Sequence, residues 1–292
     1  MASFAEWVEG ARLRTLPAAI APVFAGSAIA AHANALFPER AVLATLVALS
    51  LQVGVNYAND YSDGVRGTDE FRVGPQRLVG SGAAPARTVK LAAFGCFALA
   101  GLFGLVLVAL SGHWWLLGVG AACVLAAWYY TGGKRPYGYR GLGEVFVFIF
   151  FGLVATIGTV YVQVGSVPWP SWPAAIAMGA LACAVLVCNN LRDIPTDIQA
   201  GKRTLETMLG DRYSRYFYLL LALLAVAGVV ATAAGTTWWA LLGLGMLVFL
   251  VRGVRHVLRG GTGMALVQTL KLTGFAELAA GIGLYAGVLI GA

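Results

Sequence analysis

Charged residues are scarce in this chain. Only 11% of its 292 residues are Asp, Glu, Lys or Arg, whereas soluble domains carry about a quarter. Hydrophobic residues make up 59% of the chain, and the mean hydropathy is +0.78. This composition excludes an ordinary soluble domain and indicates a membrane protein with several spanning segments.

Cysteine and histidine are also rare, with four and three residues. The cysteines lie in apolar stretches without C-x-x-C spacing, so we interpret them as small buried side chains. The histidines are scattered, and no pair has the spacing of metal ligands. The sequence therefore does not support a zinc or haem site.

Long apolar runs fill most of the chain. Windows of about 20 apolar residues predict nine spanning helices. They lie near residues 17–33, 41–58, 89–110, 113–130, 144–163, 174–191, 217–234, 237–253 and 266–289. We therefore expect an all-α membrane protein, with residues 1–292 forming a single domain of nine transmembrane helices.

Basic residues and tryptophans fall at opposite ends of these spans. Nineteen of the twenty Lys and Arg residues lie on one predicted face, and Arg40 is the exception. The positive-inside rule puts that face and the N-terminus in the cytoplasm and the C-terminus outside. Six tryptophans fall at the outer boundaries, as amphipathic rings prefer: Trp114, Trp115, Trp169, Trp172, Trp238 and Trp239. We expect a multi-pass protein of the cell membrane.

Carboxylates gather at the cytoplasmic ends of two spans. "NDYSDGVRGTD" closes the second span, and "NNLRDIPTDIQAGKRT" closes the sixth. Positions 0, +3 and +7 of the two stretches lie on one face of a helix; they are Asp60, Asp63 and Gly67 in the first and Asn190, Asp193 and Asp197 in the second. An internal four-helix pseudo-repeat, with motifs at 56–69 and 189–203, would produce this match.

Such paired carboxylates at a membrane rim suit a hard divalent cation. Mg²⁺ is usually held by one or two carboxylates together with waters and substrate phosphates. Basic residues beside the acids suit a bound phosphate group. Solvated charges that only end a helix would explain one cluster, but they explain poorly two clusters with matched spacing, because charge near the hydrocarbon is costly.

A third cytoplasmic stretch, "YYTGGKRPYGYRGLGE", is rich in tyrosine and glycine. Tyr130, Tyr137 and Tyr139 are compatible with an aromatic substrate pocket or cation shielding, and equally with interfacial anchoring. Glu144 stands at the start of the fifth span, where a buried acid needs a partner or a function.

These three stretches resemble the UbiA superfamily of intramembrane prenyltransferases. The likeness runs from "RLRTLPAAIAPVFAG" through "TLETMLG", about two-thirds of the chain. In the first motif Gly67 replaces the last aspartate of the usual pattern, and the aspartate is displaced to Asp69. This variant resembles the MenA branch of the superfamily, which prenylates 1,4-dihydroxy-2-naphthoate.

The resemblance implies a fold and a reaction. We expect a nine-helix bundle with a polar cavity open to the cytoplasm and a hydrophobic tunnel open to lipid. An all-trans polyprenyl diphosphate would bind with its headgroup on Mg²⁺, for which we expect Mn²⁺ to substitute. Transfer of the polyprenyl group to the naphthoate, with loss of carbon dioxide, would give demethylmenaquinone.

The resemblance also implies roles for individual residues. The catalytic carboxylates and metal ligands would be Asp60, Asp63, Asp193 and Asp197, with Asp69 as a further metal ligand. Lys202 and Arg203 would stabilise the leaving diphosphate. The substrate-binding residues would be Asn56, Asn59, Arg66, Lys134, Arg135, Tyr137, Tyr139, Asn189, Asn190 and Arg192.

Two alternatives remain open from the sequence. The same fold could act on another aromatic acceptor, such as homogentisate or another phenol. A secondary transporter would also show intramembrane charges and an internal repeat, although transporters usually place their polar residues near the bilayer midplane. The prenyl chain length and the oligomeric state are not predicted by the sequence.

Overall fold

The computed structural model describes residues 2–67 and 77–291. Within these ranges the regular secondary structure is helical, apart from one isolated bridge between Arg140 and Arg203. The elements are α1 (Phe4–Gly10), η1 (Leu13–Thr15), α2 (Pro17–His32), α3 (Pro38–Arg66), α4 (Ala86–Ser111), α5 (Leu116–Tyr129), η2 (Tyr137–Tyr139), α6 (Gly143–Val147), the π-helix η3 (Phe148–Val154), α7 (Ala155–Val164), α8 (Ser171–Gln199), α9 (Leu205–Ala234), η4 (Trp238–Met246), α10 (Leu247–Leu258) and α11 (Met264–Gly291). The prediction of an all-α fold is confirmed.

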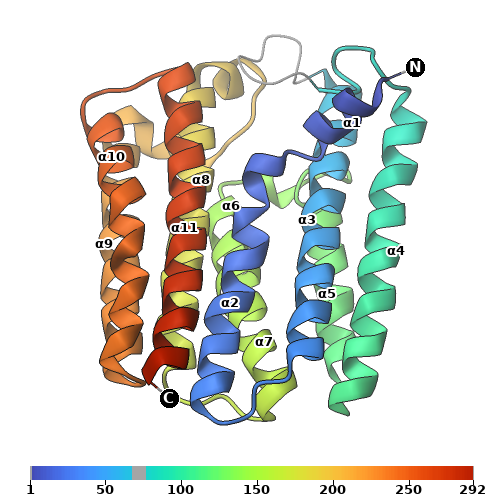
Figure 1. Ribbon diagram of the computed structural model, residues 1–292. Helices are drawn as coiled ribbons and strands as arrows, with labels where there is room; N and C mark the ends of the chain where they lie inside the picture. The colour runs from blue at the N-terminus through green and yellow to red at the C-terminus, as the bar shows by residue number, and fades with distance from the viewer. Residues whose placement is uncertain (1, 68–76, 292) are drawn as a thin grey trace.

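Each predicted span falls on a helix or a continuous run of helical turns. In the described part of the chain, seven helices are long and apolar enough to cross a membrane. There are eight if the pair that bends by 45° between residues 15 and 17 forms one span. α5 is apolar but has only 14 residues, so nine crossings stay a prediction. The two termini lie at opposite ends of the bundle (Figure 1), as expected for nine crossings.

Glycine and proline set several helix boundaries. α2 and α3 begin with Pro17 and Pro38, whose missing N–H is not needed in the first turn. α3 ends at Gly67 with φ 75°, a left-handed conformation that side-chain-bearing residues rarely adopt. The first carboxylate motif therefore occupies the last turns of a 29-residue helix. The second motif lies in the same place on α8, which also has 29 residues.

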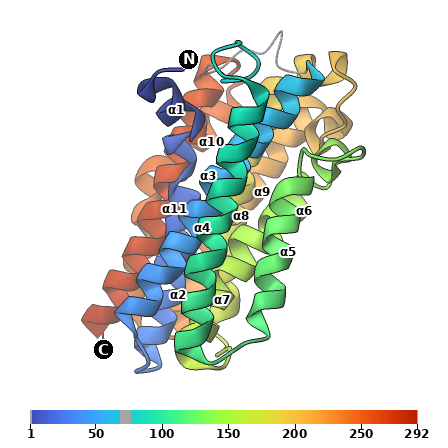
Figure 2. The same ribbon diagram turned by 90° about the vertical axis from the view of Figure 1, so that its right-hand side faces the viewer.

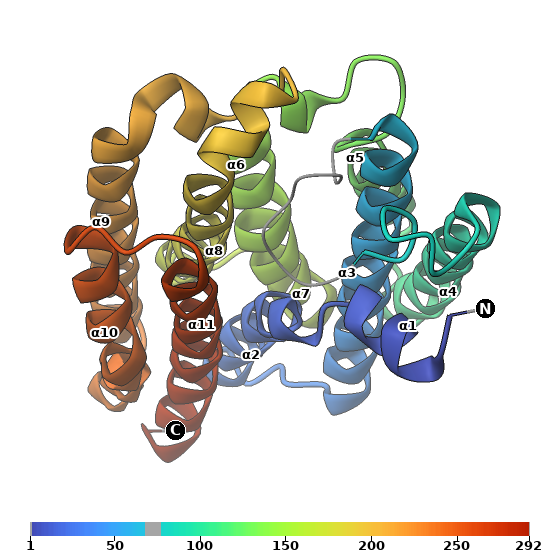
Figure 3. The same cartoon turned by 90° about the horizontal axis from the view of Figure 1, so that it is seen from above.

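The C-terminal half of the bundle is closely packed. Small and aliphatic side chains of α2, α8, α9, η4, α10 and α11 form a large buried cluster. Gly281 of α11 lies against the Ala21 backbone of α2, where a Cβ atom would meet the Ala21 carbonyl at 2.5 Å. Close approach of these backbones leaves no space between the helices on this side. Seen from above, α3, α4 and α5 lie on the opposite side (Figure 3).

The outer surface and the lower end fit a membrane environment. α4 and α5 face outward (Figure 2), and α4 carries exposed apolar side chains such as Phe94 and Leu102. The six tryptophans expected at one boundary are all at least half exposed. Arg40 donates hydrogen bonds to carbonyls in the last turns of α7 and α4, at Val162 (2.7 Å) and Leu110 (3.0 Å). This basic residue therefore neutralises helix C-termini at the end remote from the motifs.

Candidate functional site

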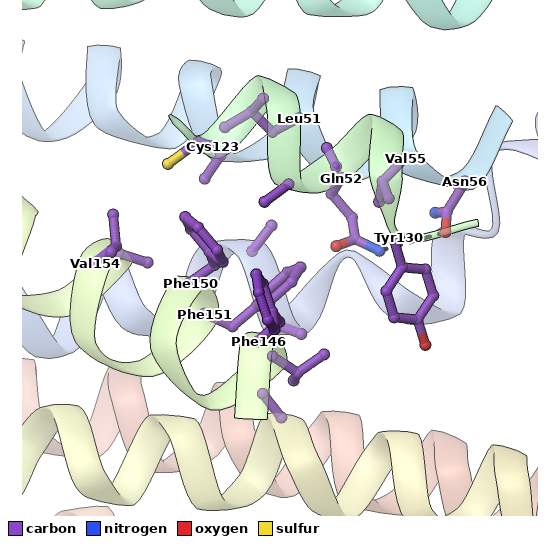
Figure 4. A pocket seen from close by; sticks show the side chains of 18 of the residues that line it. Leu51, Gln52, Val55, Asn56, Cys123, Tyr130, Phe146, Phe150, Phe151 and Val154 are labelled. Carbon is purple, nitrogen blue, oxygen red and sulfur yellow. Dashed lines mark hydrogen bonds between the residues drawn. The ribbon is translucent and has the colours of Figure 1, made fainter. Parts of the chain in front are cut away.

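A cavity of about 780 Å³ lies between α2, α3, α4, α5, η3, α7 and α8. Its lining follows α3 from Asp63 back to Ala44, about 28 Å along the helix axis at 1.5 Å per residue. Polar residues of both motifs line it near the upper ends of α3 and α8, and aliphatic and phenylalanine side chains line the rest. Phe146, Phe150 and Phe151 face this space from the fifth span (Figure 4).

The first motif is held by segments distant in sequence. Asp63 accepts a hydrogen bond from the Tyr139 hydroxyl (2.6 Å) and forms an ion pair with Arg77 at 3.7 Å. Asp60 is fully buried, and its two oxygens accept hydrogen bonds from the backbone N–H groups of Leu78 and Val79, both at 2.9 Å. Asp60 therefore fixes the segment that follows the motif. Each carboxylate oxygen keeps a second lone pair, so this contact does not exclude a metal.

Other residues of the first motif tie α3 to neighbouring segments. Asn59 accepts a hydrogen bond from the Thr131 hydroxyl (2.8 Å). Arg66 donates to the carbonyls of Thr131 and Gly133 and lies over the Tyr139 ring at 5.3 Å. Asn56 donates to the Ala11 carbonyl at 2.9 Å. These contacts join the motif to residues 130–140 and to the N-terminal segment.

The described contacts of the second motif involve Arg192 of the same helix, Lys202 just beyond it and Glu144. Arg192 makes a two-pronged contact with Asp193, at 2.7 and 2.6 Å, and also donates to Asn189 (2.9 Å). The Lys202 ammonium lies 3.5 Å from Asp197. Asn190 donates to Glu144 at 3.0 Å, which supplies the partner that this buried acid needed.

The tyrosines of the third stretch belong to the site. Tyr130 and Tyr137 line the cavity, and Tyr139 lies between Asp63 and Lys202, whose ammonium is 5.2 Å from its ring centre. Tyr137 stacks on Phe146 with ring centres 3.9 Å apart and donates to the Ala126 carbonyl (2.8 Å). Burial raises the pKa of the Tyr137 phenol, so the phenol stays protonated. This placement favours an aromatic substrate pocket over interfacial anchoring of the tyrosines.

The structure separates the predicted site residues into three groups. Nine line the cavity: Asn56, Asn59, Asp63, Tyr137, Asn189, Asn190, Asp193, Asp197 and Lys202. Seven lie outside its lining: Asp60, Arg66, Lys134, Arg135, Tyr139, Arg192 and Arg203. Lys134, Arg135 and Arg203 are exposed at the surface. Asp69 lies outside the described residues.

Sequence reasoning missed several polar residues of the cavity. Arg77 is buried, lines the cavity and pairs with Asp63. Arg12, Thr15 and Gln52 form a second polar corner of the cavity wall. No spacing rule identifies them. The sequence offered one signal for this corner. Gln52 falls within a predicted span, where polar side chains are costly and usually functional.

The oxygen donors of the cavity suit a magnesium ion that takes the rest of its ligands from water and substrate. Among residues 2–67 and 77–291, no three Asp, Glu, His or Cys side chains are close enough to form a metal site. Asp63, Asp193 and Asp197 nevertheless line one cavity, from two helices and with only oxygen donors. Because Mg²⁺ commonly completes its shell with waters and substrate phosphates, these residues fit it.

Comparison with known proteins gives consistent results. The sequence model of the UbiA prenyltransferase family matches residues 19–272. The chain is 53% identical over 279 residues to 1,4-dihydroxy-2-naphthoate octaprenyltransferase of Mycobacterium tuberculosis, covering 95% of this chain and 94% of the relative. Its fold is similar to a UbiA homologue of Aeropyrum pernix, with a TM-score of 0.72 and 18% identity over 94% and 97% of the two chains. A UbiA homologue of Archaeoglobus fulgidus bound to GPP and Mg²⁺ is also similar, with a TM-score of 0.65 and 14% identity over 96% and 99%.

Proposed function

We propose, from the premise that this chain belongs to the UbiA prenyltransferase family, that it transfers a polyprenyl group from an all-trans polyprenyl diphosphate to 1,4-dihydroxy-2-naphthoate. The observation that carries the proposal is a single cavity with carboxylates and Lys202 near one end and an apolar lining along about 28 Å of α3. The acceptor is supported by the high identity to a mycobacterial enzyme that is named for this substrate.

The cavity provides a place for each part of the donor substrate. The polyprenyl chain packs along the apolar walls, where Phe146 and Phe150 stack with ring centres 6.0 Å apart. Its diphosphate lies beside Asp63, Asp193 and Asp197. Lys202, which lines the same end of the cavity, offers the negative leaving group a cation.

Asp63, Asp193 and Asp197 would hold Mg²⁺, and Mn²⁺ would substitute for it. The metal supplies positive charge that stabilises the departing diphosphate. The chain's own residues orient this site, because Tyr139 and Arg77 hold Asp63 while Arg192 holds Asp193. Asp60 and Asp69 remain further predicted ligands.

The reaction balances without an added base. The allylic C–O bond breaks, and the diphosphate leaves with the electron pair. The electron-rich ring attacks the allylic carbon and forms the new C–C bond. Loss of carbon dioxide from the same ring carbon returns an electron pair to the ring. The product is the hydroquinone form of demethylmenaquinone, and the buried aromatic side chains exclude water from the allylic cation.

The orientation in the membrane is part of the proposal. The N-terminus and both motifs face the cytoplasm, and the C-terminus faces outward, because the basic residues concentrate at the motif end. Cysteines introduced at the exposed positions Ser81 and Gln199 should become labelled only from the cytoplasmic side, and one at the exposed Ser166 only from outside. Labelling of positions 81 and 166 from the same side would contradict nine crossings.

The activity is tested directly with purified protein. Incubation with Mg²⁺, a labelled polyprenyl diphosphate and a panel of acceptors should give prenylated product from 1,4-dihydroxy-2-naphthoate. The panel includes homogentisate, because another phenolic acceptor is the nearest alternative. Product from homogentisate and none from the naphthoate would overturn the proposal. Family membership itself argues against the transporter alternative.

A further inference from the structure

One polar group in the wall of the cavity lacks a partner. Gln52 lies on α3, one turn before Asn56, and its side chain points into the cavity (Figure 4). The residue is only 6% exposed, and its Oε1 atom accepts no hydrogen bond. An unpaired buried acceptor loses the hydrogen bond it would make to water and lowers stability. A ligand that brings a donor to this oxygen would remove that cost.

The neighbouring hydrogen bonds fix which end of the Gln52 amide faces the cavity. The Thr15 hydroxyl donates to the Arg12 carbonyl (2.9 Å), so its oxygen accepts from Gln52 Nε2 at 2.8 Å and from Asn56 Nδ2 at 3.0 Å. Asn56 Oδ1 also faces Gln52 Nε2, at 3.5 Å. Reversing the amide would put its oxygen against these two acceptors. Oε1 therefore points away from Asn56 (Figure 4).

The proposed substrates differ in what they can donate to this atom. A diphosphate offers acceptors, and a polyprenyl chain offers neither donors nor acceptors. The aromatic substrate carries two hydroxyl groups, which are donors. Gln52 also precedes Asp63, the carboxylate of α3 that lines the cavity, by eleven residues, about 16.5 Å along the helix axis. That distance separates it from a cation held at the carboxylates and leaves room for a two-ring acceptor beside the allylic carbon.

We propose that Gln52 is a specificity-determining residue, whose Oε1 accepts a hydrogen bond from one hydroxyl of the naphthoate acceptor. This inference rests on the proposed function. Arg12 lines the cavity at the same corner and donates to the Asn56 carbonyl at 3.4 Å, which brings a cation near the acceptor's carboxylate. An acceptor without the hydroxyl leaves Oε1 buried and unpaired, and therefore binds less tightly.

The experiment measures inhibition constants for analogues that lack one or both hydroxyls. 1-Hydroxy-2-naphthoate, 4-hydroxy-2-naphthoate and 2-naphthoate compete with 1,4-dihydroxy-2-naphthoate in the wild-type protein and in Gln52→Met, which keeps the length and removes the acceptor. The matched control is Gln163→Met. Gln163 is equally buried, but it lies outside the cavity lining and bonds to Ser27 and Thr159.

In the wild type and in Gln163→Met, loss of one particular hydroxyl should weaken binding about tenfold or more. In Gln52→Met that difference should shrink to about twofold. The KM for the naphthoate should rise roughly tenfold, while the KM for the polyprenyl diphosphate changes by less than about twofold. Ratios between analogues do not depend on how much protein is correctly folded.

Equal analogue ratios in wild type and Gln52→Met would overturn the inference, as would an equal rise in both KM values. If Gln52→Met does not fold, two readouts remain. Gln52→Asn shortens the side chain by one methylene and should reduce the ratio. In the wild type alone, inhibition constants that do not change when either hydroxyl is missing would also overturn the role of Gln52. A wild-type protein that does not prenylate the naphthoate would instead refute the proposed function.

Discussion

The two carboxylate motifs occupy matching places on α3 and α8, but they are held in different ways. Asp60 and Asp63 take their partners from segments 14 to 76 residues away: Leu78, Val79, Arg77 and Tyr139. Among the described residues, Asp193 and Asp197 contact Arg192 and Lys202, which lie within five residues of them. These contacts of the first motif tie distant segments to the cavity, whereas those of the second bring basic residues beside its carboxylates.

This difference separates structural from chemical effects of mutation. Removing a carboxylate from the first motif loosens a distant segment as well as the site. Removing one from the second should disturb distant segments less, and it removes the carboxylate beside Arg192 or Lys202. A comparison of activity and stability across the two motifs can therefore distinguish the two roles.

Metal removal should have the largest effect, because it acts on both motifs at once. Chelation is expected to abolish turnover, and added Mg²⁺ or Mn²⁺ should restore it. Product formation from labelled polyprenyl diphosphate measures this. The control is thermal stability in the chelator without substrate, which should change little, since the described residues hold no site made of three protein ligands. Full turnover in the chelator would contradict a metal role for either motif.

Single carboxylate substitutions should have the next largest effect, and their effect on stability should differ between the two motifs. Asp193→Asn keeps the shape and removes a charge, so we expect a loss in rate of about a hundredfold, close to 2.7 kcal/mol, with unfolding temperature little changed. Asp60→Asn should also lower stability, by roughly 1–3 kcal/mol, because one carboxylate oxygen becomes an NH2 donor that cannot accept from the backbone N–H it faces. Rates and unfolding temperatures in detergent would measure both.

Equal stability of Asp60→Asn and Asp193→Asn would show that the hydrogen bonds from Leu78 and Val79 to Asp60 do not stabilise the fold. Near-normal activity of Asp193→Asn would instead support the simpler interpretation of both motifs as solvated helix ends.

Much of this arrangement follows from local patterns in the sequence. Apolar windows located the helices, because a membrane span needs about 20 apolar residues. The helical spacing placed Asp193 and Asp197 on one face of a helix, and both line the cavity. A buried acid requires a partner, and Glu144 has one in Asn190.

The remainder depends on tertiary contacts that no local pattern encodes. Asp60 was predicted as a metal ligand, but its visible partners are backbone amides of a segment that folds back onto α3. Arg77 and Gln52 belong to the cavity only because α2, α3 and the segment after α3 converge there. The short α5 was predicted as a longer helix, because hydropathy does not distinguish the apolar turn before it from the helix itself.

Lys202 and Arg203 provide the third test, since sequence reasoning assigned both to the diphosphate. The segment is extended here, so adjacent side chains point to opposite sides. Lys202 lines the cavity, whereas Arg203 is exposed. Lys202→Ala should therefore lower turnover by about tenfold to a hundredfold and weaken polyprenyl diphosphate binding. Arg203→Ala should change it by less than about threefold, as expected of a surface substitution. A larger loss in Arg203→Ala would show that this residue turns inward when substrate binds.

A smaller loss than that of Lys202→Ala is expected at Tyr139, which contacts both motifs. Its hydroxyl donates to Asp63 (2.6 Å), and its ring lies 5.2 Å from the Lys202 ammonium. Tyr139→Phe keeps the ring and removes one hydrogen bond to a charged group, worth about 1.5–3 kcal/mol at most. Other contacts still hold Asp63, including Arg77, so we expect turnover to fall only about five- to tenfold, with unchanged affinity for the naphthoate. Tyr139→Leu should cost more, because it also removes the ring beside Lys202. Tyr213→Phe, at an exposed position on α9, is the control and should behave as wild type. If Tyr139→Phe and Tyr139→Leu lose the same activity, the ring makes no contribution and the two motifs are not linked through this residue.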